Sequence, residues 1–154
     1  MRTLVRALVG IVMAASLTPL LAEEAALRIQ DPWIREAPPT AGALAAYMKI
    51  QNTGQGLRIL TGASSPLFGH VMLHGTRIQN DMAQMFHLDE IRIPPGETVV
   101  FEPGGNHFML MRPQKALVAG DTVPLELEFK EGRPIPLMVE VRKGAEDSHE
   151  HRHH

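Results

Sequence analysis

Residues 123–129 read Val123-Pro124-Leu125-Glu126-Leu127-Glu128-Phe129, and this stretch decides the fold class. Apolar and acidic residues alternate along it, which is typical of a β-strand with one face in the core and the other in solvent. We predict that the two leucines and Phe129 face the core and that both glutamates face outward. Further apolar runs predict strands over residues 26–29, 43–50, 57–64, 70–74, 91–93, 98–102, 107–112 and 136–141.

Turn signals rich in Gly, Pro and Asn separate these runs. Regular short strands joined by such turns predict an all-β fold, either a sandwich or a barrel. The chain has 154 residues, the length of one domain, and we assign that domain to residues 23–142. The sequence contains no internal repeat and predicts no helix of ordinary length.

The N-terminal 22 residues have the pattern of a signal peptide. Arg2 and Arg6 form a positive start, and residues 7–21 are an almost uninterrupted apolar run. This run suits the core of a signal peptide and is short for a membrane-spanning helix. We expect cleavage after Ala22, which would place the mature protein in the periplasm without a membrane span. An uncleaved membrane anchor is the alternative.

Charge and cysteine content exclude several classes of function. The formal net charge is −2, and removal of Arg2 and Arg6 would leave 13 basic and 17 acidic residues, a charge of −4. Such a chain lacks the basic excess of a nucleic-acid-binding protein. It contains no cysteine, so neither a disulfide nor a metal-binding thiolate is available.

Four residues of the central stretch carry the functional argument: His74, Met85, His107 and Met109. Ten residues separate the first two, 21 separate Met85 from His107, and one separates His107 from Met109. Side chains alternate along a strand, so His107 and Met109 are predicted to project to one side, roughly 7 Å apart along the chain. Met85 falls in residues 79–87, which we predict to be loop-like, and His74, Met85 and His107 are expected near strand ends.

Two imidazoles and two thioethers form a soft, uncharged set of ligands, which favours Cu(I) over zinc or hard cations. A blue-copper electron-transfer site is excluded because it requires a cysteine thiolate. The alternative for each residue alone is structural, since methionines often fill cores and buried histidines are often only hydrogen-bonded. Outside the predicted ligand set we place the remaining central histidines and methionines, with His87 the best substitute ligand, and the aromatic residues of two early strands: His70, Met72, Met82, His87, Met111, Trp33 and Tyr47.

At these residues the sequence resembles the periplasmic PCuAC-type copper chaperones, whose copper-binding motif has the same three intervals. The resemblance extends over about residues 28–142 and includes the segments 93–99, 103–111 and 120–125. One departure is the loop Gln55-Gly56-Leu57, which lacks an expected acidic pair. The resemblance implies a cupredoxin-like β-sandwich that carries Cu(I). It also implies delivery to the copper centre of cytochrome c oxidase, with an oxidase subunit or another copper chaperone as the partner. We expect the protein to be a monomer.

The C-terminal residues 143–154 form a polar tail that we predict to be disordered. Its histidines could hold a borderline ion such as Cu(II), which the resemblance also implies: His149, His151, His153 and His154. The alternative origin is a purification tag, but Glu150 and Arg152 interrupt the histidine run.

Two classes of function therefore remain open, a metallochaperone that delivers copper and a protein that sequesters or stores it. The four core ligands serve both classes. A site for a single ion favours carriage, because a storage protein gains by binding many ions. We do not expect an enzyme, since no nucleophile–base pair is evident and thioethers disfavour the redox cycling of a copper oxidase.

Overall fold

The computed structural model describes residues 26–144, and all regular secondary structure in this range is β-strand. The predicted signal peptide, residues 1–22, lies outside the described residues. The strands are β1 (Leu27–Arg35), β2 (Ala43–Asn52), β3 (Arg58–Ser64), β4 (Phe68–Gln79), β5 (Met82–Leu88), β6 (Ile91–Ile93), β7 (Thr98–Phe101), β8 (His107–Pro113), β9 (Thr122–Phe129) and β10 (Ile135–Arg142). Within residues 26–144 there is no helix with the length and apolar character that a membrane span requires.

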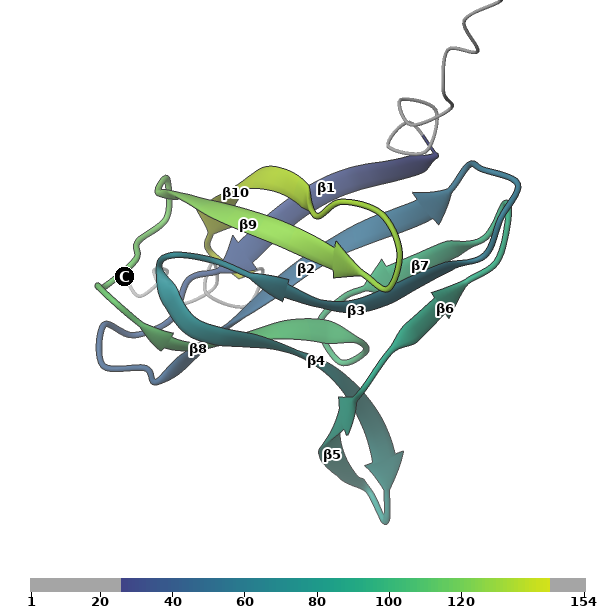
Figure 1. The fold of residues 1–154 in the computed structure, drawn as a ribbon. Helices are drawn as coiled ribbons and strands as arrows, with labels where there is room; N and C mark the ends of the chain where they lie inside the picture. The colour runs from purple at the N-terminus through teal and green to yellow at the C-terminus, as the bar shows by residue number, and fades with distance from the viewer. Residues whose placement is uncertain (1–25, 145–154) are drawn as a thin grey trace, which may run out of the picture.

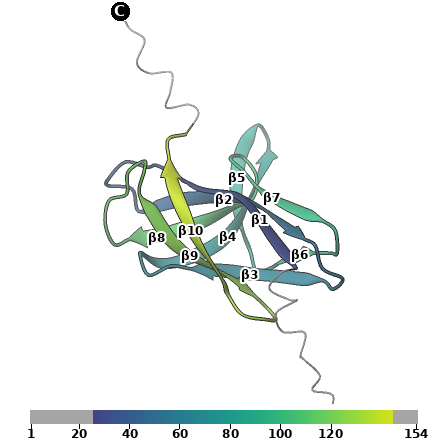
Figure 2. The same ribbon diagram turned by 90° about the horizontal axis from the view of Figure 1, so that it is seen from above.

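The strands wrap around one core in the order β5-β4-β8-β2-β1-β10-β9-β3-β6, with β7 paired to β2 (Figures 1 and 2). Strand β4 pairs with β8 and also with β3, where Ala63 lies opposite Val71, so the path of strands closes on itself. The contact between β1 and β10 is parallel, and the other strand pairs are antiparallel. The predicted all-β fold with a single domain is confirmed.

The core consists of side chains from alternate positions of these strands. Leu125 and Leu127 are fully buried, as predicted, and Phe129 is partly buried at the end of β9. In β8, Phe108 and Leu110 are also fully buried, and Phe108 stacks on Phe101 with 4.6 Å between ring centroids. Each such side chain contributes roughly 1.5–3 kcal/mol through removal of apolar surface from water. Because Phe108 and Leu110 point inward, the alternate residues of β8, His107 and Met109, point to the opposite, outer face of the sheet.

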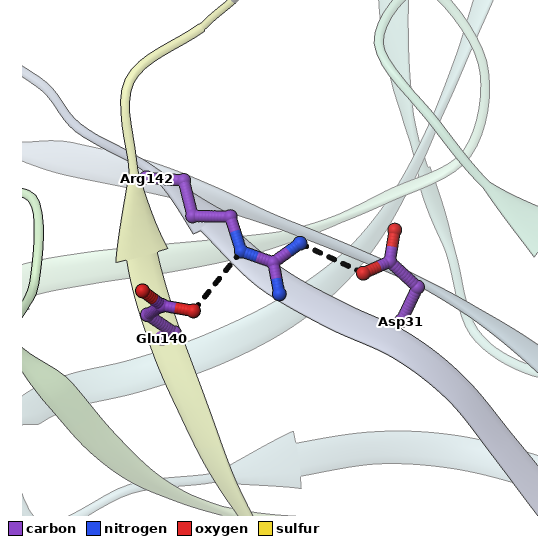
Figure 3. Close-up of polar contacts among 3 residues, drawn as sticks. All are labelled: Asp31, Glu140 and Arg142. Atoms are coloured by element: carbon purple, nitrogen blue, oxygen red, sulfur yellow. Dashed lines mark hydrogen bonds and ion pairs between the residues drawn. The ribbon is translucent and has the colours of Figure 1, made fainter.

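Strand β1 continues past the predicted residues 26–29 because a β-bulge accommodates Asp31 and Pro32. The register with β2 shifts between Gln30 and Trp33, and Asp31 has a φ of 44°. Its carboxylate accepts a hydrogen bond of 2.7 Å from Arg142, which also contacts Glu140 at 3.2 Å (Figure 3). These groups are exposed, so the network stabilises the β1–β10 contact only weakly. After the bulge the pairing of β1 with β2 resumes, and Trp33 lies opposite Tyr47 of β2.

The prediction of a loop over residues 79–87 is wrong. Strand β4 runs to Gln79, and β5 returns from Met82 in a continuous antiparallel register as a hairpin. Its two-residue turn is Asn80-Asp81, with φ values of 52° and 60°. Such positive values define the turns that match the twist of a hairpin, and Asn and Asp tolerate them. Figure 1 shows this hairpin extending away from the rest of the sandwich.

Inside the hairpin, the ring of Phe86 lies over Gly75 in the opposite strand. A Cβ atom at Gly75 would stand 2.6 Å from the Phe86 ring, which is too close for any side chain. The exposed aromatic ring therefore depends on the absence of a side chain at this position. The Arg77 guanidinium also lies over this ring, 5.4 Å from the ring centroid. This packing fixes β5 against β4 on the face opposite to the histidines.

The β2–β3 connection, where the sequence lacks the expected acidic pair, is held by the fully buried side chain of Asn52. Its amide nitrogen donates to the carbonyl oxygens of Gly56 and Ile93, at 2.7 and 2.8 Å. Its amide oxygen accepts a hydrogen bond of 3.0 Å from the Gly54 nitrogen. One side chain thus satisfies three backbone groups and joins the loop to β6.

Candidate metal centre

His74 in β4 lies directly opposite His107 in β8. The ring centroids are 5.7 Å apart and the ring planes are inclined at 74°. Both side chains are on the outer face, because their neighbours Leu73 and Phe108 point into the core. The expectation that His74, Met85 and His107 lie near strand ends is wrong for the first two. His74 is central in β4 and Met85 is central in β5, whereas His107 is the first residue of β8.

The backbone before β8 fixes the tautomer of the neutral His107 ring. Its Nδ1 lies 3.1 Å from the carbonyl oxygen of Gly105, which can only accept a hydrogen bond. The Nδ1 atom is therefore the donor, and Nε2 keeps its lone pair. A histidine that donates one ring N–H to a carbonyl and presents its other nitrogen is arranged as metal ligands commonly are. The ring is 7% exposed, so it is held in place by its surroundings.

The His74 ring has a nitrogen without a partner. Among residues 26–144, the buried Nδ1 of His74 has no hydrogen-bond partner. Burial lowers the pKa of this imidazole, and the nearby rings of His107 and His87 lower it further. The ring is thus neutral near pH 7, and its unpartnered nitrogen costs about 1–3 kcal/mol of stability. A bound metal ion would satisfy this atom, so the residue fits the predicted role.

The two methionines lie on the same face as the histidines. Met109 follows His107 by two positions in β8 and is paired with Ala45 of β2 and Met72 of β4. Met85 lies opposite Thr76, two positions along β4 from His74. Register and alternation therefore direct all four predicted side chains to one region of the outer face. Met85 is 63% exposed on the extended hairpin.

A cavity of about 350 Å³ lies between this hairpin and β2 and β8. Three of the four predicted residues line it, and the fourth, His74, is the cross-strand neighbour of His107. The lining consists of Ala43, Leu44, Ala45, Tyr47, Thr76, Ala83, Met85, Gly104, His107 and Met109. The alanines of β2 leave the space beside β8 open because their side chains are small. The cavity is thus mostly apolar, with one imidazole and two thioethers in its wall.

Tyr47 belongs to this wall, although the sequence pattern placed it outside the site. It is buried, and its ring centroid lies 4.8 Å from that of Trp33. Burial raises the pKa of Tyr47, while a hydrogen bond with Arg35 opposes that shift. Alternation within β2 could have located it, because Ala43, Ala45 and Tyr47 share one face.

The remaining histidines and methionines surround the centre at different distances along the strands. His87 lies opposite His74, with ring centroids 5.8 Å apart, and its Nε2 is 3.3 Å from Asp89. His70 is farther along β4, with its Nδ1 2.9 Å from the Arg112 guanidinium. Met72 and Met111 lie opposite Met109 and His70, and Met82 begins β5. The part of the chain that the structure describes contains no group of three His, Cys, Asp or Glu residues able to hold a metal ion.

Two solved structures place the fold among the PCuAC-type domains. The solution structure of apo-DR1885 from Deinococcus radiodurans has a TM-score of 0.61 and 27% identity, covering 95% of this chain and 94% of that one. The copper-bound PCuAC domain from PmoF2 has a TM-score of 0.66 and 24% identity, covering 77% and 94%. The expectation of this fold is therefore confirmed.

Residues 27–141 match a family described as "LpqE-like: Putative lipoprotein LpqE-like", and the chain belongs to that family. A relative from Leifsonia xyli subsp. xyli, named "Putative lipoprotein Lxx21020", is 33% identical over 117 residues. The match covers 75% of this chain and 69% of the relative. The predicted tail site, His149, His151, His153 and His154, lies outside the residues that the structure describes.

Proposed function

We propose that this protein is a copper carrier that binds one Cu(I) ion through His74, Met85, His107 and Met109. The observation that carries the proposal is the pair of opposed imidazoles. His107 presents Nε2 because Nδ1 donates to Gly105, and His74 holds a buried nitrogen without a partner. Copper is further supported by a solved relative with bound Cu(I), CuI-DR1885 from Deinococcus radiodurans, which is 29% identical over 77% of this chain and 78% of that one.

The donor set favours the cuprous ion. Thioether sulfur is a soft ligand, imidazole suits copper, and neither adds charge to the site. The chain has no cysteine, so the only sulfur ligands it can offer are thioethers. A neutral site holds Cu(I) less tightly than a pair of thiolates does. The ion can therefore pass to a thiolate acceptor with a favourable change in free energy.

The position of the ligands supports delivery. The β4–β5 hairpin extends from the sandwich (Figure 1). Met85 on this hairpin is 63% exposed, whereas His107 is buried. A ligand from a partner can replace the exposed thioether first, while the imidazoles still hold the ion. This stepwise exchange is what a carrier needs and gives an enzyme no advantage.

We propose that the acceptor is the copper centre of cytochrome c oxidase or another copper chaperone, and that the carrier acts as a periplasmic monomer. The signal-peptide pattern of residues 1–22 and the lipoprotein description of the family support an exported protein. Sequestration is the second candidate function. It is favoured by the four histidines within residues 149–154, which would add capacity for further ions.

Transfer to a thiolate acceptor separates the two functions. The Cu(I)-bound protein is mixed under anaerobic conditions with the reduced, metal-free copper domain of an oxidase subunit, and copper is measured in each after separation. A carrier loses most of its copper to an equimolar acceptor. Copper that remains on this protein when the acceptor is in excess would contradict delivery and favour sequestration.

A further inference from the structure

Three histidines form a row across three adjacent strands of the outer face. His87 of β5 lies opposite His74 of β4, which in turn lies opposite His107 of β8. The ring centroids are 5.8 Å apart in the first pair and 5.7 Å apart in the second. His74 is thus the common neighbour of two imidazoles on its two sides.

Exposure decreases steadily along this row. The His87 side chain is 53% exposed, His74 is partly buried, and His107 is 7% exposed. The methionines follow the same order, since Met85 on β5 is 63% exposed and Met109 on β8 is partly buried. The exposed His87 therefore has the exposed Met85 two positions away, and the buried His107 has the partly buried Met109 two positions away. The gradient leads from solvent to the base of the site.

The three imidazoles do not surround a single point. The described residues contain no group of three His, Cys, Asp or Glu side chains placed to hold one ion. A ring nitrogen binds a metal at about 2.0 Å, so two rings that share an ion have centroids within roughly 6.5 Å of each other. Both pairs satisfy this limit. The geometry is therefore that of two neighbouring positions with His74 in common.

The side chain of His87 can offer a ring nitrogen to an ion. Its Nε2 lies 3.3 Å from the carboxylate of Asp89, a contact that is an ion pair only when the ring is protonated, and a neutral imidazole keeps a lone pair on one of its two nitrogens. The Asp89 side chain is 98% exposed, so the contact is weak and the ring can turn without loss of much stability. His107, by contrast, is held by a hydrogen bond from Nδ1 to a backbone carbonyl and is buried.

We infer that His87, His74 and Met85 form an outer Cu(I) position from which the ion passes to the inner ligands His107 and Met109. This inference rests on the proposed function. His74 and Met85 keep their bonds to copper while the bonds to His107 and Met109 form and the bond to His87 breaks. The exchanged ligands are neutral, so the ion remains Cu(I) and no electron or proton is transferred. Release to a partner follows the same path in reverse.

The test compares His87→Ala with His70→Ala. His70 of β4 is, like His87, an exposed histidine of the outer face, but it lies opposite Met111 and contacts Arg112. Stopped-flow transfer of Cu(I) from a chromogenic chelator gives the rate of loading, and competition with the same chelator gives the equilibrium affinity. We expect His87→Ala to load roughly tenfold more slowly, with an affinity within about threefold of the wild type. We expect His70→Ala to change neither quantity.

A second readout does not depend on rates. Ag(I) is a redox-inert substitute for Cu(I), and ring ¹⁵N NMR signals of the full chain report which histidines it contacts. With less than one equivalent of Ag(I), the His87 signal should broaden or shift together with those of His74 and His107. An unchanged loading rate in His87→Ala, or a His87 ring signal that Ag(I) leaves unmoved, would overturn the inference.

The same experiment separates this inference from the proposed function. Loss of all Cu(I) binding in His87→Ala would also overturn the relay, because His87 would then be a ligand of the resting site. If His74→Ala and His107→Ala together leave Cu(I) affinity unchanged, the proposed site itself is wrong.

Discussion

Replacement of His74 by leucine should make the metal-free protein more stable and abolish its copper site. The wild-type ring keeps a buried Nδ1 without a partner among the described residues, a cost of about 1–3 kcal/mol. Leucine has no polar atom, but it loses the two edge contacts with His107 and His87, worth about 0.5 kcal/mol each. The net expectation is a gain of about 1 kcal/mol in the free energy of unfolding near pH 7.5.

The gain should grow in acid. The pKa of His74 is lowered in the folded protein, while in the unfolded chain it is about 6.5. The unfolded chain therefore takes up a proton that the folded ring resists, so His74 costs the wild type stability as pH falls below about 6.5. The leucine variant has no ionisable group at this position, so it lacks this loss of stability in acid. The difference in stability between the two proteins should consequently be larger at pH 5.5 than at pH 7.5.

Urea unfolding of both metal-free proteins at the two pH values measures these differences. With Cu(I) at 100 times its dissociation constant the wild type should gain about 2.7 kcal/mol, and the variant should gain much less, so the order of stability reverses. A variant that is less stable than the wild type by more than about 1 kcal/mol without metal would refute the reasoning, because the unpartnered nitrogen would then not be destabilising.

Four further results are expected. Met109→Leu keeps the apolar volume, so the unfolding free energy should change by less than about 1.5 kcal/mol while Cu(I) affinity falls, and Met138→Leu on exposed β10 should alter neither in the same chelator titration. Asn52→Ala removes three hydrogen bonds and leaves two carbonyls and the Gly54 N–H without this partner, so it should cost about 3 kcal/mol in urea unfolding, whereas Gln55→Ala in the same turn should be neutral. Cu(I) affinity should be constant from about pH 8 to 6.5 and then fall gradually, because the lowered pKa keeps His74 neutral longer and thioethers do not titrate; an affinity that does not change down to about pH 5 would argue against histidine ligands. Deletion of residues 148–154 should remove a Cu(II)-binding event seen by electron paramagnetic resonance and leave Cu(I) binding intact, and loss of Cu(I) binding instead would make the tail part of the main site.

Local sequence patterns were sufficient for the fold class and for the shared face of the ligands in each strand. Alternation identified β9 and its buried leucines, and it placed His107 and Met109 on one face of β8. Both predictions succeeded because the face on which a side chain lies depends only on its position within one strand. The spacing of the four candidate ligands matched a known motif, and the fold of that family is what the structure has. Their role as ligands remains a prediction.

Long-range register could not be read from the sequence. His74 and His107 are 33 residues apart, and only the pairing of β4 with β8 places their rings opposite each other. The position of His87 beside His74 likewise depends on the pairing of β4 with β5.

Two strand boundaries were predicted wrongly. Asn80-Asp81 between polar and apolar residues is a hairpin signal, yet residues 79–87 were predicted to be a loop. The first predicted strand ended at residue 29, but the bulge at Asp31 lets β1 continue through Pro32 to Arg35. In both places a tertiary partner strand supplied the hydrogen bonds that make an extended conformation favourable.

The central claim is that two nitrogen and two thioether ligands hold Cu(I), and X-ray absorption at the copper edge tests it most directly. The sample is the chain in which His149, His151, His153 and His154 are replaced by alanine, with one equivalent of Cu(I), so that only the core site contributes. The account predicts a cuprous edge and a first coordination shell with both nitrogen and sulfur, and a loss of sulfur scattering in Met109→Leu. A spectrum without sulfur scatterers would contradict the account.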